Sequence, residues 1–176
     1  MKVKLYGVRG SIATAGEENR RYGGNTSCVA VEAGGQVIIF DAGTGIRKLG
    51  NDLAKGASAT SGVDAHLFFS HLHWDHIQGF PFFSPAFMPG NKLSVYGVQS
   101  PVVPVLEGDP ATLTLSADDL SSTGAPVIDT SSVKAAMAAQ MTAPNFPVGL
   151  DAMRAELRFL DVPYGERIVL GCPVSP

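Results

Sequence analysis

The first half of the chain alternates apolar and polar side chains in short runs, the period-two pattern of strands whose two faces differ. Gly34 and Gly35 separate two of these runs, and a glycine pair in that position is typical of a tight hairpin. The run at 65–70 is apolar almost throughout, which predicts a strand covered on both faces. The strands predicted from this pattern lie at 2–8, 28–33, 36–42, 65–70 and 92–98.

Helical spacing and strong helix formers predict helices between and after these strands. They lie at 46–56, 132–141 and 150–157. Thr44 and either Ser131 or Ser132 are the expected N-caps of the first two. The stretch 100–132 is rich in Pro, Ser, Thr and Asp, which indicates a long excursion with at most a short helical turn. A last pair of strands is predicted at 157–162 and 166–170.

Because a hairpin comes first and helix-separated strands follow, the pattern predicts one domain, 1–176, of the α/β or α+β class with a mixed sheet. The composition, 45% hydrophobic and 16% charged, is that of a globular protein. A net charge of −3 argues against nucleic acid as a broad partner, although Arg9, Arg20 and Arg21 could form a local basic patch. We expect a cytoplasmic protein without a membrane partner, since no run approaches the ~20 apolar residues of a span.

Three of the four histidines fall in SHLHWDH, residues 70–76, directly after an apolar run. On an extended chain His71 and His73 point the same way and can converge on one metal ion. If the backbone turns at Trp74, Asp75 and His76 can reach a second ion beside the first. Two ions ~3.5–4 Å apart are the usual clamp for hydrolytic displacement. Mixed imidazole and carboxylate ligands favour zinc, with manganese or iron as the other candidates.

Neither the fourth histidine nor the two cysteines are assigned a metal-binding or catalytic role. His66 lies an odd number of positions before His71, so on a regular strand it faces the other way and is left out of the site. Cys28 and Cys172 make no disulfide framework and are expected to behave as small buried side chains.

HLHWDH is the His-x-His-x-Asp-His pattern of metallo-β-lactamase fold hydrolases, and the chain resembles the branch near phosphodiesterases and ribonuclease Z-like enzymes. The stretches that carry the resemblance are GVRGS at 7–11, RYGGNTSCV at 21–29, IIFDAGTGIRKLG at 38–50, HWDHIQGFPFF at 73–83 and, more weakly, NFPVGLDAM at 145–153. The resemblance covers Met1 to about residue 170. It is specific for the superfamily but not for a substrate, because relatives act on phosphodiesters, lactams, thioesters and other esters.

The resemblance implies an αββα sandwich with two zinc ions at one edge, between two sheets. It places His71 and His73 on one ion and Asp75 and His76 on the other, with Asp75 able to accept a proton from the attacking water. Asp41 would lie beneath the site and orient a ligand histidine; a plain turn residue is the other interpretation, and the sequence leaves both open.

Three residues of the first motif could meet a phosphate, although a solvated loop explains them nearly as well: Arg9, Gly10 and Ser11. For Asn25 and Thr26 we expect a hydrogen-bonding role in the fold.

The family completes its metal pair with a further histidine, a bridging aspartate and a last histidine, whereas this sequence has no histidine after His76. We therefore expect the chain to represent the N-terminal part of the fold, or a short form with a reduced site. Later carboxylates are present but stand in no matching motif: Asp109, Asp118, Asp119, Asp129, Asp151 and Asp161. Half a sandwich would leave an apolar sheet face or edge uncovered, through which the chain could form a homo-oligomer.

Three functions follow from these expectations. The first is a dinuclear hydrolase of a small-molecule or nucleotide phosphodiester, with a site that is incomplete in this chain. The second is a non-catalytic metal-binding or scaffold module, which would hold metal without hydrolysis. The third is an interaction protein that uses 100–132 as a contact surface and binds no metal.

Overall fold

The computed structural model describes all residues except 56–61, 99–131, 164, 166 and 171–176. The strands are β1 (Lys2–Gly7), β2 (Cys28–Ala33), β3 (Gln36–Phe40), β4 (Asp64–Phe68), β5 (Lys92–Val98) and β6 (Glu156–Val162). The α-helices are α1 (Gly45–Lys55), α3 (Trp74–Ile77) and α5 (Val133–Gln140). Short 3-10 turns are η1 (Glu17–Asn19), η2 (Phe80–Phe82), η3 (Ser84–Phe87) and η4 (Leu150–Ala152).

The six strands form one sheet in the order β1-β2-β3-β4-β5-β6. The first three are antiparallel, and β3, β4, β5 and β6 run parallel to one another. Gly34 and Gly35 make the β2–β3 hairpin turn with φ of 57° and 77°, left-handed values that glycine adopts without a Cβ clash. The predicted mixed α/β sheet is therefore confirmed, and its parallel part places the carboxyl ends of β3, β4 and β5 along one edge.

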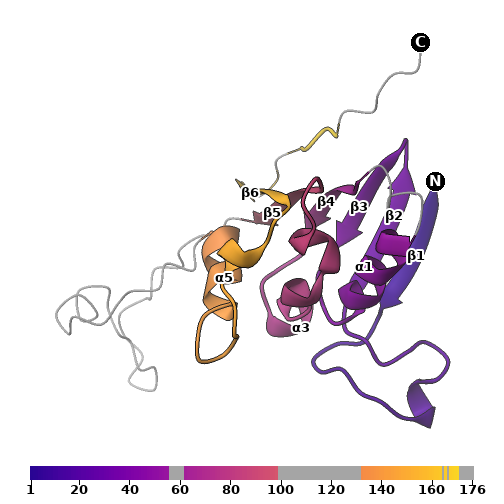
Figure 1. The fold of residues 1–176 in the computed structure, drawn as a ribbon. Helices are drawn as coiled ribbons and strands as arrows, with labels where there is room; N and C mark the ends of the chain where they lie inside the picture. The colour runs from indigo at the N-terminus through magenta and orange to yellow at the C-terminus, as the bar shows by residue number, and fades with distance from the viewer. Residues whose placement is uncertain (56–61, 99–131, 164, 166, 171–176) are drawn as a thin grey trace, which may run out of the picture.

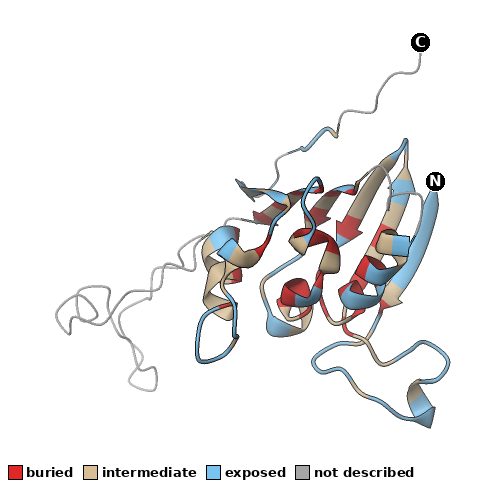
Figure 2. Ribbon diagram, viewed as in Figure 1, coloured by how far each residue is buried: buried red, intermediate tan, exposed pale blue. Residues whose placement is uncertain are grey.

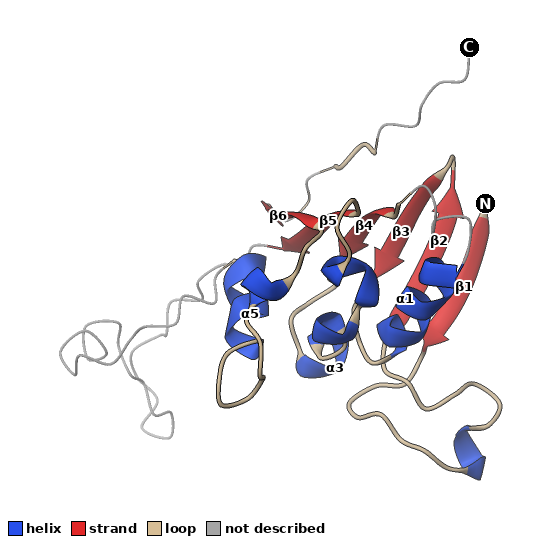
Figure 3. Ribbon diagram, in the orientation of Figure 1, coloured by secondary structure: helices blue, strands red, loops and turns tan. Residues whose placement is uncertain are grey.

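All three helices lie on the same face of the sheet (Figures 1 and 3). Helix α1 packs on β1 and β2, and α5 packs on β5 and β6. Buried residues gather where these helices meet the sheet, as Figure 2 shows. Ile39, Leu67 and Phe80 are fully buried there, and burying a side chain of this size stabilises the fold by about 1.5–3 kcal/mol. The core therefore lies in a single layer, between the helices and one side of the sheet.

The opposite face of the sheet carries no helix in the described part of the chain (Figure 3). Val3 and Leu5 are 55% and 64% exposed on β1. A row of rings continues across the sheet, with the centroids of Phe40 and Phe68 5.8 Å apart and those of Phe68 and Tyr96 4.3 Å apart. An uncovered apolar face is thus present, and the association that it would mediate stays a prediction.

The prediction that both faces of the strand at 65–70 are covered was wrong. In β4, Ala65 and Leu67 are buried against the helices, whereas His66 and Phe68 are only half-buried on the bare face. An unbroken apolar run does not show whether both faces of a strand are covered within the chain or only one.

His66 faces away from the histidine cluster, as its odd spacing predicts. Its ring nitrogens lie 3.0 Å from the Tyr96 hydroxyl and 3.2 Å from Gln36 Oε1.

Several element boundaries differ from the predictions. Residues 150–157 contain only the turn η4 before β6 begins at Glu156, and 167–170 form no strand. Ser132 caps α5 by accepting from the Ala135 N–H at 3.1 Å, as expected. The Thr44 hydroxyl instead accepts from the Thr26 N–H at 2.9 Å. Gly56, the excursion at 100–132 apart from Ser132, and Cys172 lie outside the described residues.

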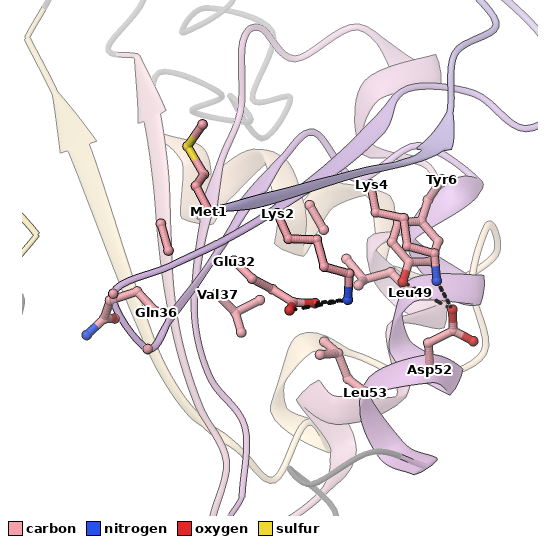
Figure 4. A pocket seen from close by; sticks show the side chains of 14 residues that line it. Met1, Lys2, Lys4, Tyr6, Glu32, Gln36, Val37, Leu49, Asp52 and Leu53 are labelled. Carbon is pink, nitrogen blue, oxygen red and sulfur yellow. Dashed lines mark hydrogen bonds and ion pairs between the residues drawn. The ribbon is translucent and has the colours of Figure 1, made fainter.

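A hollow of about 560 Å³ lies between α1 and the end of the sheet formed by β1, β2 and β3 (Figure 4). Its charged side chains neutralise one another: Lys2 pairs with Glu32 at 3.3 Å and Lys4 with Asp52 at 2.8 Å. None of the predicted metal ligands lines it. The hollow therefore offers no unpaired charge to a ligand and is not the candidate site.

Cys28 is fully buried in β2. Burial, followed by the negative charge of Asp41, raises the pKa of its thiol to about 12. The reactive thiolate is then only roughly 10⁻⁵ of the population at neutral pH. We expect native Cys28 to resist thiol reagents and to react promptly once the chain is unfolded. Peptide mapping by mass spectrometry after alkylation, with and without denaturant, checks this; rapid native labelling would contradict the buried position.

Candidate metal centre

The histidine cluster lies at the carboxyl edge of the parallel strands. Strand β3 ends at Phe40 and β4 at Phe68, and the two strands are paired in parallel, so Asp41 and the segment 69–76 leave the sheet side by side. The Asp41 N–H donates to the Phe68 carbonyl at 2.9 Å, which extends the ladder by one step. Open α/β sheets place their ligand sites at this edge. The fold thus brings the FDAGTG and SHLHWDH motifs together, with Asp41 and Ser70 in contact although they lie 29 residues apart in sequence.

The ring of His71 lies close to both other histidine rings of the motif. The ring centroids of His71 and His73 lie 4.4 Å apart, and those of His71 and His76 lie 4.1 Å apart. The chain is extended at His73, with φ −63° and ψ 150°, and turns into α3 at Trp74. The turn at Trp74, which the sequence left as a condition, is present. It folds His76 back toward His71, so the imidazoles form one cluster rather than two separate pairs.

Asp41 is the polar centre beneath this cluster. It is only 6% exposed, and its φ of 63° is left-handed, a region that Asp tolerates better than most residues. One carboxylate oxygen accepts from the Ser70 N–H at 2.8 Å, and the other lies 2.8 Å from His76 Nδ1. Ser27 Oγ donates to the carboxylate at 3.0 Å. The structure therefore brings Asp41 into both arrangements left open by the sequence, the tight turn and the contact with a candidate ligand histidine.

The contact with Asp41 sets the tautomer of His76. An ionised carboxylate only accepts hydrogen bonds, so Nδ1 of His76 carries the proton and Nε2 keeps its lone pair. This assignment comes from the hydrogen-bond network. A ring held in this way can present Nε2 to a metal ion.

Ser70 was not singled out from the sequence, yet it links two of the rings to Asp41. Its hydroxyl lies 2.8 Å from Asp41 Oδ1 and 3.1 Å from His71 Nδ1. Because the hydroxyl proton goes to the carboxylate, its oxygen is left to accept from an Nδ1–H of His71. The Nε2 of His71 then keeps its lone pair as well. The usable signal was position: a hydroxyl residue at the end of a buried strand, directly before the first histidine.

Asp75 is anchored by the loop that follows β1. The Ser11 N–H donates to Asp75 Oδ2 at 2.8 Å, and this hydrogen bond is the main cause of a lowered pKa of the Asp75 carboxyl. The same oxygen lies 3.4 Å from His76 Nε2. If His76 keeps the Asp41-bound tautomer, a lone pair faces a carboxylate at this distance, and a cation between them removes the repulsion.

A metal ion held between Asp75 and His76 would remove this repulsion. Burial, and then the neighbouring charges of His76 and His73, lower the pKa of His71 and so favour its neutral, metal-binding form. The donor chemistry therefore fits a metal ion better than an imidazolium cluster. Within the described residues no three His, Cys, Asp or Glu side chains are arranged to hold a single ion.

The phosphate cradle considered for 9–11 is arranged differently. The Ser11 N–H is engaged by Asp75, and the Arg9 guanidinium donates within its own loop, to the Ile12 carbonyl at 2.8 Å and to Asn19 Oδ1 at 3.3 Å. These contacts engage the Ser11 N–H and two of the three guanidinium nitrogens of Arg9, and the phosphate cradle stays a prediction. Asn25 fulfils its expected structural role, since its carbonyl accepts the N–H groups of Val8 and Arg9 at 3.1 Å.

Close backbone packing explains the glycines of the two motifs. A Cβ on Gly43 would collide with the Asp75 carbonyl and with Thr26, and one on Gly79 would collide with the Gly43 carbonyl. Thr26 and Thr44 exchange hydrogen bonds beside them, with Thr26 Oγ1 accepting from the Thr44 N–H at 2.8 Å. The two loops are therefore locked against each other, which fixes Asp41 relative to α3.

The later carboxylates do not reach the cluster where the structure describes them. Asp161 accepts from the Val133 N–H at 2.7 Å at the start of α5, and Asp151 is exposed on η4. The remaining four lie outside the described residues: Asp109, Asp118, Asp119 and Asp129.

Comparison with known proteins supports the superfamily interpretation in part. Ribonuclease Z of Haloarcula marismortui is 32% identical over 81 residues, which cover 46% of this chain but only 22% of that protein. The crystal structure of a new diphosphatase from the PhnP family is 18% identical, with a TM-score of 0.34 over 55% of this chain and 41% of the other. No family model matches. The sequence likeness to ribonuclease Z points to the metallo-β-lactamase superfamily, the one expected from HLHWDH.

Within the described residues, every helix is too short or too polar to span a bilayer.

Proposed function

We propose that the chain carries the metal-binding half of a metallo-β-lactamase-type phosphodiester hydrolase. The observation that carries the proposal is the cluster of three imidazoles at the sheet edge. Nδ1 of His71 and of His76 is occupied by Ser70 and Asp41, so both rings retain an Nε2 lone pair. The superfamily is supported by the likeness to ribonuclease Z, and the acceptor pair formed by His76 and Asp75 favours a cation.

Zinc is the metal that we propose, with manganese or iron as substitutes, because the donors are imidazoles and carboxylates. His71 and His73 would hold one ion, and Asp75 and His76 a second. Bound zinc would supply Lewis-acid charge and lower the pKa of water toward ~7. The chain's own groups have distinct tasks: Asp41 and Ser70 hold ring orientation, Ser11 holds Asp75 in place, and Asp75 accepts a proton.

A non-catalytic metal-binding module is the second candidate. It is favoured by the donor count, since four donors divided between two ions leave each ion with two, while a catalytic zinc usually has three protein ligands. The homo-oligomer through the bare sheet face also remains a proposal, because that face is apolar and uncovered in the described part of the chain.

Turnover of bis-p-nitrophenyl phosphate separates the two candidates. We expect the zinc- or manganese-loaded 176-residue chain to be at least ~100-fold slower than a longer chain that supplies the superfamily's further ligands. A reacting group displaced by about 1 Å can cost this much, and two donors do not fix an ion. In the longer chain His71→Ala should abolish turnover, with His66→Ala as the matched control.

Three results would count against these assignments. Tight metal without turnover in the longer chain would favour the scaffold module. Absence of metal in both chains would favour the interaction protein. Fast turnover by the 176-residue chain, lost in His71→Ala, would show that four motif donors suffice or that unassigned carboxylates complete the site.

A further inference from the structure

Trp74 stands in the middle of the candidate metal motif, yet its side chain is largely exposed and makes no hydrogen bond or ring contact with the described residues. The side chain is 74% exposed, although it is the only tryptophan of the chain and lies between His73 and Asp75. Its indole N–H has no hydrogen-bond partner and its ring no aromatic partner among the described residues. A single exposed apolar residue is ordinary on a protein surface. A tryptophan ring that is 74% exposed and lies between two candidate metal ligands is less ordinary.

The backbone around Trp74 is held firmly while its ring is left outside. The first turn of α3 fixes it from both sides: the His76 N–H donates to the His73 carbonyl at 3.0 Å, and the Gln78 N–H donates to the Trp74 carbonyl at 2.8 Å. The next side chain, Asp75, is tied to Ser11. Tryptophan keeps only two side-chain torsions once its backbone is fixed, so its ring is presented at low conformational cost.

An exposed apolar residue adjoins, in sequence, each partner of the Ser11–Asp75 hydrogen bond. Trp74 precedes Asp75, and Ile12, which is 67% exposed, follows Ser11 on the other side of the Ser11–Asp75 hydrogen bond. If the proposed metal ion is bound, an indole face beside it would suit a ligand with a planar ring next to a phosphate. The phosphate would meet the metal and the ring would stack on the indole, which is worth most for nucleobases.

We propose that Trp74 is a specificity-determining stacking platform that selects phosphate esters carrying a planar ring over those without one. This rests on the proposed function for the phosphate half of the ligand, but the ring half can be tested alone. Both aryl groups and nucleobases offer the required π-face, and the experiment distinguishes them.

The first measurement uses the fluorescence of the single tryptophan. In the wild-type chain we expect acrylamide to quench this emission efficiently and adenosine to quench it saturably. Adenosine carries no phosphate and needs no metal, so it probes the platform even if the chain binds no zinc. A shielded emission that acrylamide does not reach would overturn the proposal, because the ring would then be covered by another part of the chain or by a second copy.

The second measurement compares affinities by calorimetry on zinc-treated protein. The ligands are adenosine 5′-monophosphate, phenyl phosphate and ribose 5-phosphate. Trp74→Ala should weaken the nucleotide roughly 5- to 150-fold, the range for loss of one base–aromatic stack, and leave ribose 5-phosphate unchanged. Trp74→Phe should restore most of the binding. A loss for phenyl phosphate of similar size would indicate general aryl selection, and a smaller one would indicate nucleobases.

Phe82→Ala is the matched control, since Phe82 is 55% exposed and contacts Phe146 rather than the cluster. Equal losses for all three ligands in Trp74→Ala would contradict selection by the ring, as would unchanged affinity for the nucleotide. Wild-type protein that binds neither adenosine nor the nucleotide would also overturn the proposal. Failure of ribose 5-phosphate and of zinc to bind the wild type, with adenosine binding retained, would remove the proposed function and leave the platform standing.

Discussion

Replacing His71 and His73 together with alanine is expected to abolish stoichiometric zinc binding, with affinity lowered by more than ~100-fold. Even residues that only orient a metal ligand cost ~10–100-fold when they are removed, so loss of two direct donors costs more. The fold should survive. Both side chains are exposed, and surface substitutions usually change the free energy of unfolding by about 0.5 kcal/mol or less.

The measurement is elemental analysis after chelation and reloading, followed by a competition titration with a chromophoric chelator. His66→Ala is the matched control, because it removes the same residue type from β4 on the bare face of the sheet, where the ring contacts Tyr96. The control should bind zinc as the wild type does. If the double variant keeps the wild-type stoichiometry and affinity, the ligand assignment is wrong and the cluster is a hydrogen-bonded structural feature.

The arrangement of the histidine donors could be predicted only in part from the sequence. Alternation placed His71 and His73 on one side, and the structure brings their rings within 4.4 Å. Alternation could not place His76. Its ring centroid lies 4.1 Å from that of His71 because the chain turns at Trp74. The chain changes from extended to helical between His73 and Trp74, and this change decides whether the donors form two pairs or one cluster. Helix α3 packs closely against Gly43, and such a tertiary contact leaves no trace in the alternation of the sequence.

The role of Ser70 and the contact of Ser11 with Asp75 were missed for a similar reason, although Ser11 was a candidate for phosphate binding. Neither residue type is a metal ligand of the expected kind, and each acts through another group, Ser70 through Asp41 and Ser11 through its backbone N–H. Hydrogen bonds between residues 29 and 64 positions apart leave no local pattern. The resemblance to the superfamily predicted Asp41 beneath the site, whereas its partners came from the structure.

The sheet itself was largely predictable. The hairpin at Gly34 and Gly35 and the later strands separated by helices fixed the mixed arrangement. The overlooked point was the bare face, since Phe68 reads as core in the sequence but is half-buried beside Phe40 and Tyr96. An apolar side chain favours burial, but its hydrophobicity does not indicate which part of a protein covers it.

The two interpretations of Asp41 can be separated by a substitution that keeps the turn and removes the charge. Asp41→Asn preserves a residue that tolerates φ of 63° and an oxygen that can accept from the Ser70 N–H. The amide nitrogen would then face His76 Nδ1 in place of a carboxylate oxygen. Because the amide donates, Nδ1 must accept, and the ring proton moves to Nε2.

A proton on Nε2 removes the lone pair that His76 would offer to zinc. We therefore expect Asp41→Asn to lower zinc affinity by ~10–100-fold while the chain remains folded. Asp41→Ala should lower it similarly and also destabilise the fold. It leaves the Ser70 N–H and the His76 Nδ1–H unpaired, at about 1–3 kcal/mol each, and places a Cβ-bearing residue without a polar side chain at a left-handed φ.

Nitrogen-15 shifts of the histidine rings in metal-free protein report the tautomer directly, and a chelator competition reports the affinity. Asp64→Asn, an exposed aspartate at the start of β4, is the matched control and should change neither. Urea unfolding shows whether each variant is folded. If the His76 tautomer moves to Nε2 and zinc affinity falls, Asp41 orients the ligand. If folded Asp41→Asn keeps both the tautomer and the wild-type affinity, Asp41 is a turn residue, and orientation of His76 must come from the packing of α3 against Gly43.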